Sequence, residues 1–291
     1  MQPLRSLLFV PGNNPRMLER ALSAPADALV FDLEDSVAPD QKASARGIVA
    51  AHLAKLGSRK AFVRVNSLQT GMTAADLAAV VGPNLQGVSI GKVDTPHLAE
   101  QASTLLSHLE RERGLPAGQL TLLPWIESAQ AIMDMREIAT ATPRLLALWF
   151  GAEDFTADMG IPRSRSLEEV TVPRALIAVA ARAAGILALD TPDPDFKDIE
   201  HLAAEARQAR ALGYSGKFVI HPNQIETVNA VFTPSAEDVA QACRVVAAFE
   251  ASLKEGKASV ALDSQMVDTP VWKRAVRLVE LAESIERAQS R

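Results

Sequence analysis

The sequence predicts an α/β fold, a (β/α)8 TIM barrel followed by a C-terminal helical extension. The chain has 291 residues, a length that suits one large domain with a small appendage. Eight short apolar runs alternate with longer stretches rich in Ala and Leu. The runs are continuously apolar, as is typical of parallel strands buried on both faces. Eight strands, each followed by a helix, favour a closed barrel.

The order of these elements is regular along the first three quarters of the chain. The predicted strands are residues 6–10, 28–33, 61–66, 87–92, 120–127, 145–151, 186–190 and 217–221. The predicted barrel helices are residues 16–23, 40–55, 74–81, 96–113, 129–139, 168–184 and 198–212. A doubly wound open sheet is the competing fold. It would usually carry a glycine-rich phosphate loop after its first strand, and Pro11-Gly12-Asn13-Asn14 is not G-x-G-x-x-G.

The last part of the chain is not needed to close a barrel. We expect residues 1–232 to form the catalytic barrel and residues 233–291 to form a helical extension that belongs to the same unit. Two helices are predicted there, over residues 235–255 and 271–289, joined by a connector that contains Gly and Ser. The segment 265–270 between them is a candidate lid or oligomerisation arm.

Composition excludes several classes of protein. The chain has 30 Lys and Arg against 35 Asp and Glu, a net charge of −5 that argues against nucleic acid or an anionic membrane as the main partner. The single cysteine, Cys243, forms no internal disulfide and no cysteine-rich zinc site. No cleavable signal and no run of 18 apolar residues is present, so we expect a cytoplasmic protein without a membrane span.

Polar side chains follow every predicted strand, where a barrel of this kind carries its chemistry. They are Asn13, Asp32, Glu34, Asp35, Arg64, Asn66, Lys92, Glu127, Glu153, Asp154, Asp190 and His221. Carboxylates with few histidines suit a hard divalent cation, usually Mg²⁺. Glu127 and Asp154 follow neighbouring strands and could share one ion. The alternative is that each is a helix cap or a surface acid.

The basic residues at the strand ends have two interpretations each. Arg64 could bind a substrate carboxylate through its planar fork, or it could form an internal ion pair with Asp32 or Glu34. Lys92 could form a Schiff base with a keto substrate, which requires a desolvated amine. With several acids expected around it, Lys92 is more consistent with a protonated, charge-balancing residue.

Two further groups have a supporting role in the prediction. Asp32 and Glu34 share one face of a strand and could hold metal-bound waters or Lys92, whereas Asp35 could instead cap the next helix. Arg16 and Arg20 lie four residues apart on one face of the first helix. Together with the helix N-terminus they could bind a phosphate, or they could form a solvated surface.

Several of these strand ends together resemble one family, the citrate lyase β-subunit-like branch of the HpcH/HpaI aldolase superfamily. The matching motifs are Ser6-Leu7-Leu8-Phe9-Val10-Pro11-Gly12-Asn13, Phe31-Asp32-Leu33-Glu34-Asp35-Ser36-Val37, Val63-Arg64-Val65-Asn66, Ile126-Glu127-Ser128-Ala129, Phe150-Gly151-Ala152-Glu153-Asp154, residues 216–225 and Met266-Val267-Asp268-Thr269-Pro270. The resemblance runs over essentially the whole chain in order. Two positions depart from the family pattern: Ala131 stands where a Gly is common, and Gly91 where a Pro precedes the lysine.

The resemblance implies a Mg²⁺-dependent enzyme that acts on acyl thioesters, with Glu127 and Asp154 as metal ligands. It implies that Arg64 binds the substrate carboxylate and that Asn13, Arg16 and Arg20 belong to the coenzyme A site. The family's C-terminal aspartate matches Asp268, which in related enzymes covers the active site of a neighbouring subunit. The resemblance therefore also implies a homotrimer or hexamer.

The chemistry expected from the resemblance is retro-aldol or Claisen-type cleavage of a β-hydroxyacyl-CoA such as citramalyl-CoA or malyl-CoA, with Asp268 as the candidate acid/base. Three alternatives remain open: a thioesterase on the same esters, the citryl-thioester lyase subunit of a citrate lyase that works on an acyl carrier protein, and a barrel that has lost catalysis.

Overall fold

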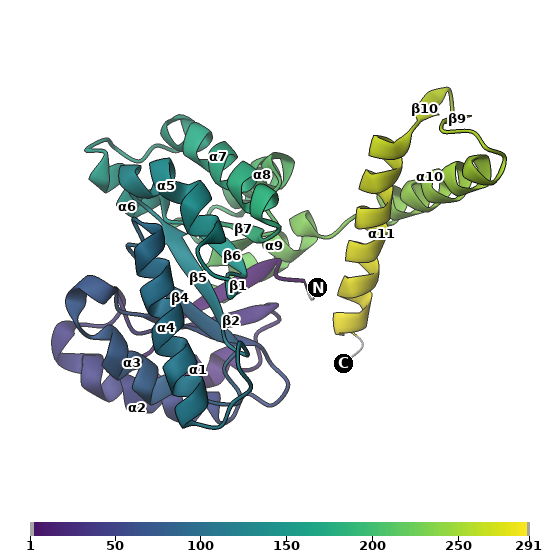
Figure 1. Cartoon of the computed structure of the whole chain (residues 1–291). Coiled ribbons are helices and arrows are strands. Elements are labelled where there is room, and N and C mark those ends of the chain that lie inside the picture. The colour runs from purple at the N-terminus through teal and green to yellow at the C-terminus, as the bar shows by residue number, and fades with distance from the viewer. Residues whose placement is uncertain (1–2, 290–291) are drawn as a thin grey trace. The chain divides into compact units, whose positions relative to one another are not determined.

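The computed structural model describes residues 3–289, and it divides into two compact units (Figure 1). One unit is Leu4–Asn229, and the other is Ala230 onward together with Pro3. Each unit is described by itself below. Among residues 3–289, no helix combines the length and the apolarity that a membrane crossing requires.

The first unit is the predicted barrel. Its eight strands pair in parallel in chain order, and β1 pairs with β8 to close the sheet. The strands are β1 (Ser6–Pro11), β2 (Ala28–Asp32), β3 (Ala61–Val65), β4 (Gly87–Ile90), β5 (Thr121–Ile126), β6 (Ala147–Phe150), β7 (Leu187–Asp190) and β8 (Gly216–Val219). The register places Leu7 opposite both Ala28 and Phe218. All eight predicted strands are confirmed within a few residues.

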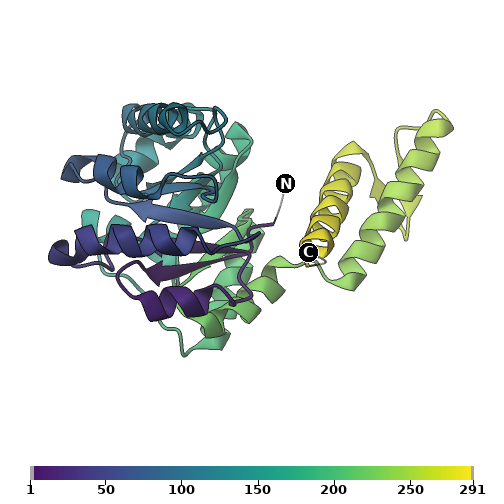
Figure 2. The same cartoon turned by 90° about the horizontal axis from the view of Figure 1, so that it is seen from below.

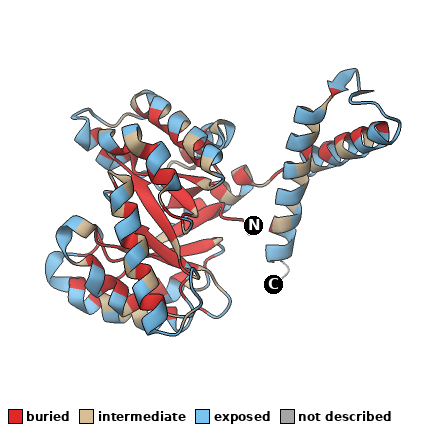
Figure 3. Ribbon diagram, in the orientation of Figure 1, coloured by how far each residue is buried: buried red, intermediate tan, exposed pale blue. Residues whose placement is uncertain are grey.

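Helices cover the outside of the barrel, with exposed outer faces over buried strands (Figure 3). They are α1 (Pro15–Ala21), α2 (Lys42–Leu53), α3 (Thr73–Val80), α4 (Pro96–Glu112), α5 (Ala129–Thr140), α6 (Ala152–Asp158), α7 (Glu168–Ala184), α8 (Ile199–Leu212) and α9 (Ile225–Phe232). The sequence did not predict α6 or α9. The structure therefore places Asp154 in the first turn of a short helix, where the sequence suggested a strand end or loop.

Aromatic side chains fill the middle of the barrel. Trp125 and Phe218 are stacked with ring centroids 5.3 Å apart, and Trp149 lies 4.0 Å from Phe218 and 5.3 Å from Trp125. Phe9 joins them at 5.1 Å from Phe218. The indole N–H of Trp125 donates to the Ser89 hydroxyl at 2.6 Å. This packed aromatic interior lies directly beneath the polar residues at the strand ends.

The second unit consists of two helices and a small hairpin, with the helices side by side (Figure 2). Its elements are α10 (Ala236–Lys254), β9 (Val260–Leu262), β10 (Gln265–Val267) and α11 (Thr269–Gln289). Phe249 stacks on Trp272 at 5.6 Å within its own small core. Both predicted helices are confirmed, whereas the hairpin was not predicted. The sequence-based boundary at residue 232, and the idea that the two parts act as one unit, stay predictions.

Candidate active site

Carboxylates from three strand ends converge at one place in the barrel. Glu34 follows β2, Glu127 follows β5, and Asp154 lies in the first turn of α6 after β6. A Cβ atom built on Gly91 would lie 2.9 Å from Glu127 Oε1 and 3.1 Å from Glu34 Oε1. Both carboxylates therefore occupy the space that a side chain at position 91 would need.

Glu127 is held from two sides by backbone. The N–H of Lys92 donates to Glu127 Oε1 at 2.6 Å. On the other side, a Cβ atom on Gly151 would lie 2.6 Å from Glu127 Oε2 and 2.7 Å from its Cβ. The two glycines thus leave a slot of the right width for one carboxylate, and any larger residue at position 151 would displace it.

The acids of this cluster are buried and lie close enough to repel one another. Burial, reinforced by the charge of Asp154, raises the pKa of Glu127 from 4.5 to about 8. Burial also raises the pKa of Glu34 to about 7, although the nearby Arg64 opposes the shift. The pKa of Asp154 is raised by burial and by Asp35. A cluster with this excess of negative charge would be stabilised by a bound cation.

Arg64 lies at the edge of this cluster in a bidentate ion pair with Asp32. Its Nε and one terminal nitrogen donate to Asp32 at 2.7 and 2.6 Å, and the other terminal nitrogen donates to Asp35 at 3.0 Å. The guanidinium also lies 5.1 Å from the ring of Phe9 and 5.6 Å from that of Trp125. The ion pair that the sequence left as an alternative is therefore present. The terminal nitrogen that donates to Asp35 also lies 3.4 Å from Glu34 Oε2, so Arg64 contacts all three acids that follow β2.

A cavity of about 340 Å³ opens beside these groups. Its described lining residues are Phe9, Pro11, Met17, Asp32, Ser36, Arg64, Trp125, Gly151, Ala152, Glu153, Asp154, Thr191, Pro192 and Ile220. Most of this wall is apolar, while Arg64 and Asp154 give it a cationic and an anionic part. The structure thus brings the predicted Asp32, Arg64 and Asp154 together at one cavity, and Glu127 borders it behind Gly151.

Other predicted residues lie further out. Lys92 is exposed, with a left-handed backbone (φ 57°), and its charge lowers the pKa values of Glu34 and Asp154 without a close ion pair among the described side chains. Arg16 and Arg20 are exposed on α1, whose Met17 reaches the cavity. The Asn13 amide donates to Gln41 Oε1 at 2.5 Å.

Asp268 lies in the other unit. Its carboxylate accepts from the backbone N–H of Val271 at 3.2 Å, at the start of α11. The sequence placed it on a mobile lid segment, and the structure gives it a capping bond between β10 and α11.

Sequence reasoning missed the apolar part of the wall, including Met17 and Ile220, and it missed Thr191. Thr191 directly follows Asp190 at a strand end. A search of the strand ends that included hydroxyl side chains as well as charged ones would therefore have found it.

The site fits a magnesium ion by its donor set. Glu127 and Asp154 offer hard carboxylate oxygens in an environment where acids outnumber the nearby Arg64 and Lys92, and the glycine slot holds Glu127 in place. A second group of potential ligands, Asp193, His201 and Glu205, also lies close together. There, His201 Nδ1 already contacts Asp193 at 3.0 Å and Glu205 pairs with Lys217 at 2.9 Å. The imidazole of His201 and the ammonium of Lys217 are thus already partners of these acids.

Comparisons with known proteins agree on one family. The model of the HpcH/HpaI aldolase/citrate lyase family matches residues 5–222. The chain is 38% identical to citrate lyase subunit beta of Leuconostoc mesenteroides over 96% of this chain and 93% of that protein. It is 33% identical to the mitochondrial citramalyl-CoA lyase of Rattus norvegicus, over 98% and 87%. Among solved structures, the protein CitE of Mycobacterium tuberculosis in complex with magnesium, acetoacetate and coenzyme A is similar with a TM-score of 0.78 and 31% identity, over 97% and 98%.

Proposed function

Since the chain belongs to the HpcH/HpaI aldolase/citrate lyase family, we propose that it is a Mg²⁺-dependent carbon–carbon lyase that cleaves a β-hydroxyacyl-CoA of the citramalyl or malyl type. The observation that carries the proposal is the uncompensated pair Glu127 and Asp154 beside a cavity that also holds Arg64. The ligands in the CitE structure, magnesium and coenzyme A, support the same assignment.

In the proposed reaction, the residues of this chain bind the substrate, accept a proton from it and donate a proton to it. Glu127 and Asp154 would hold Mg²⁺, which supplies Lewis-acid stabilisation of the departing keto acid. Arg64 binds the substrate carboxylate, while Asp32 fixes the plane of the guanidinium. The β-hydroxyl loses its proton, the C–C bonding electrons pass to the thioester enolate, and the enolate carbon takes a proton.

The cavity wall favours substrates with a small group on the hydroxyl-bearing carbon. A citryl thioester carries a carboxymethyl group there, and with it a second carboxylate, where a citramalyl ester has a methyl group and a malyl ester a hydrogen. Among the described residues that line the cavity, one, Arg64, is a cation, and three of its five N–H groups are already used. The apolar part of the wall, which includes Phe9, Pro192 and Ile220, suits a methyl group better than a charge.

Mass spectrometry on a panel of coenzyme A esters tests this function. The purified chain is incubated with citramalyl-, malyl- and citryl-CoA, with Mg²⁺ or with a chelator. We expect cleavage of citramalyl- or malyl-CoA to acetyl-CoA and a keto acid with Mg²⁺, and none with chelator. Release of free coenzyme A with the acyl group intact would instead identify a thioesterase. A citryl thioester of an acyl carrier protein is added to the panel, and its turnover alone would identify the citrate lyase alternative.

We also propose that Asp268 serves as the acid/base in the site of a neighbouring subunit of a homotrimer or hexamer. The proposal depends on the family resemblance and on the position of Asp268 in a unit separate from the barrel. Co-expression of Glu127→Ala and Asp268→Ala chains tests it, because a mixed oligomer can assemble one intact site. Activity well above that of either parent is expected. No recovery in mixed oligomers confirmed by native mass spectrometry would contradict it.

The cytoplasmic location stays a prediction, as do the coenzyme A contacts of Asn13, Arg16 and Arg20.

A further inference from the structure

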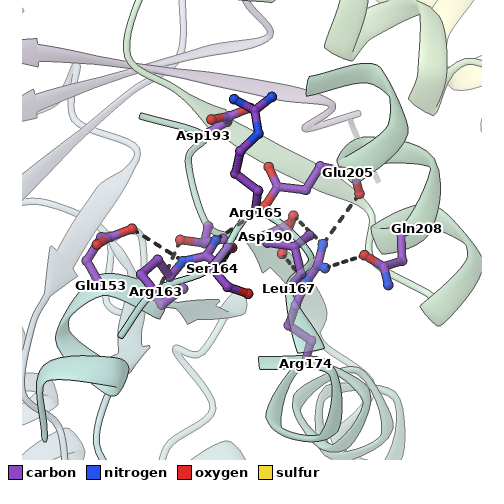
Figure 4. Close-up of polar contacts among 12 residues, drawn as sticks. Glu153, Arg163, Ser164, Arg165, Leu167, Arg174, Asp190, Asp193, Glu205 and Gln208 are labelled. Carbon is purple, nitrogen blue, oxygen red and sulfur yellow. Dashed lines mark hydrogen bonds and ion pairs between the residues drawn. The ribbon is translucent and has the colours of Figure 1, made fainter. Parts of the chain in front are cut away.

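A second group of charged side chains is buried below the strand ends of β7 and β8. It consists of Arg174, Lys217, Asp190 and Glu205, and its two positive charges equal its two negative charges, so we call it the balanced cluster. Figure 4 labels Arg174, Asp190 and Glu205. The side chains of Arg174, Asp190 and Lys217 have no exposed surface, and that of Glu205 is 2% exposed. Arg174 binds Asp190 through Nε at 3.0 Å and a terminal nitrogen at 2.9 Å. Lys217 lies 2.8 Å from Asp190 and 2.9 Å from Glu205. None of these residues touches the cavity.

The ammonium of Lys217 also reaches toward the site. It donates to the backbone carbonyl of Thr191 at 2.6 Å, within the buried interior. Thr191 itself is 1% exposed and contributes to the cavity wall. The two carboxylates hold the ammonium from below, so the position of the Thr191 carbonyl is fixed relative to the barrel core.

The Thr191 hydroxyl completes the link to the metal-binding carboxylates. It accepts a hydrogen bond from the backbone N–H of Ala152 at 3.3 Å. Ala152 is the first residue of α6, and Asp154 lies two residues later in the same turn. The first N–H groups of a helix have no partner inside the helix and need one from outside.

Gly151 cannot cap this helix by itself. A side chain at the N-cap position usually accepts from the second or third N–H of the helix. Here that position is Gly151, which makes no side-chain cap, and a Cβ atom there would collide with Glu127 at 2.6 Å. The close approach of Glu127 thus excludes a capping side chain at 151, and the bond from the first N–H, that of Ala152, to Thr191 holds the first turn of α6 from outside the helix.

A second contact runs in the same direction. Arg163 lies 3.4 Å from Glu205 and 3.3 Å from Glu153, the residue next to Asp154 (Figure 4). Both connections join the balanced cluster to the first turn of α6.

From these contacts we infer that Thr191, anchored by Lys217, is a positioning residue that sets the N-terminal turn of α6 and thereby the placement of Asp154 for Mg²⁺. The inference rests on the proposed function, because it takes Asp154 as a metal ligand. Partners one step beyond a metal's ligands commonly change metal affinity by about 10- to 100-fold when they are replaced.

The experiment compares Thr191→Val with Thr191→Ser by calorimetric titration of metal-free protein with Mg²⁺ and Mn²⁺, with no substrate present. Valine keeps the shape and removes the acceptor, whereas serine keeps the hydroxyl. We expect Thr191→Val to bind metal about tenfold more weakly or worse, and Thr191→Ser to stay within about twofold of the unmodified chain. In assays, saturating Mg²⁺ should restore much of the kcat of Thr191→Val.

The outcomes separate the two claims. Equal metal affinity in Thr191→Val and the unmodified chain would overturn the positioning role and leave the proposed function intact. Equal loss in both variants would overturn it too, since the hydroxyl would then be irrelevant. If Thr191→Val does not fold, weaker binding by a folded Thr191→Ser would count against the inference and unchanged binding would support it. Failure of the unmodified chain to bind metal would overturn the proposed function.

Discussion

Two groups of buried charge in one barrel show opposite behaviour. At the ends of β7 and β8, Asp190 is fully buried, yet Lys217 and Arg174 overcome the cost of burial and lower its pKa. Across the barrel, Glu127 is buried almost as deeply, and burial, reinforced by the charges of Asp154 and Glu34, raises its pKa to about 8. Two carboxylates with a similar degree of burial thus have pKa values shifted in opposite directions.

The difference separates charges that serve the fold from charges that await a ligand. A buried carboxylate with two cations has what it needs within the chain, and removing a partner damages the structure. A buried carboxylate among other carboxylates costs stability until a cation arrives. Charge balance, more than burial or residue type, therefore identifies the candidate active site. Four predictions test the comparison.

The largest expected effect is a loss of stability when a positive charge is removed from the balanced cluster. Lys217→Met leaves Asp190 and Glu205 short of a cation in the interior, so we expect a loss of about 3–5 kcal/mol in the free energy of unfolding. Urea titration of the metal-free chain measures it. Lys55→Met is the control, because Lys55 pairs with Glu19 on an exposed surface and should change stability by about 1 kcal/mol at most. Similar losses for both variants would contradict the comparison.

Next, Glu127→Gln should remove function while sparing the fold. The amide loses one charged ligand oxygen, and the drop in Mg²⁺-dependent activity should exceed about 100-fold, the upper range for residues one step further from a metal. Without metal, the melting temperature measured above about pH 8 should be unchanged or higher, because a neutral amide replaces a buried, ionised carboxylate. Glu137→Gln, at an exposed position on α5, serves as the control. A melting temperature that still rises with Mg²⁺ in Glu127→Gln would show that the ion binds elsewhere.

A smaller effect on substrate affinity is expected at Arg64, which lies at the edge of the carboxylate cluster of the candidate active site. Arg64→Lys keeps the charge, but an ammonium cannot reproduce the two bonds to Asp32 or the planar contact of a guanidinium with a carboxylate. The loss should be about 1.5–3 kcal/mol, or tenfold or more in apparent substrate affinity. Steady-state kinetics with saturating Mg²⁺ measure it. A KM within twofold of normal would restrict Arg64 to its internal ion pair.

The smallest effect is a pH dependence of the metal-free chain. Because the pKa of Glu127 is raised from 4.5 to about 8, the folded chain holds a proton that the unfolded chain releases. The stability from this group is present below about pH 4.5 and is lost as the pH rises through about 8. The melting temperature should therefore fall from pH 6 to pH 8.5, and Mg²⁺ should raise it most at the upper end. An identical pH profile for Glu127→Gln would assign the dependence to another group.

The sequence predicted the barrel because its strands are buried on both faces and read as plain apolar runs. It failed for α6, since Gly151-Ala152-Glu153-Asp154 begins directly after β6 and the seven-residue helix has no side-chain cap of its own. It failed for the hairpin of β9 and β10, whose two turn residues, Asp263 and Ser264, both have positive φ angles. Asn-Gly or Asp-Gly would have signalled such a turn, and Asp-Ser does not.

The site was predictable where one rule sufficed. Strand-end position pointed to Glu127, Asp154 and Arg64. The link from Lys217 through Thr191 to Ala152 was not predictable, because it joins residues 26 and 39 positions apart through a backbone carbonyl and a backbone N–H. Sequence patterns describe side chains, and these bonds depend on where the barrel places the main chain.

The stacking of Arg64 on Trp125 has an optical consequence. The chain has three tryptophans, and Trp125 lines the cavity while Trp272 packs in the C-terminal unit. A carboxylate that binds Arg64 changes the electric field at the indole beneath it, so ligand binding should alter the intrinsic fluorescence of the barrel. With Trp272→Phe, the remaining emission comes from Trp125 and the core residue Trp149 alone. The protein thereby carries a built-in reporter with which binding can be followed by light, before any bond is broken and without an added label.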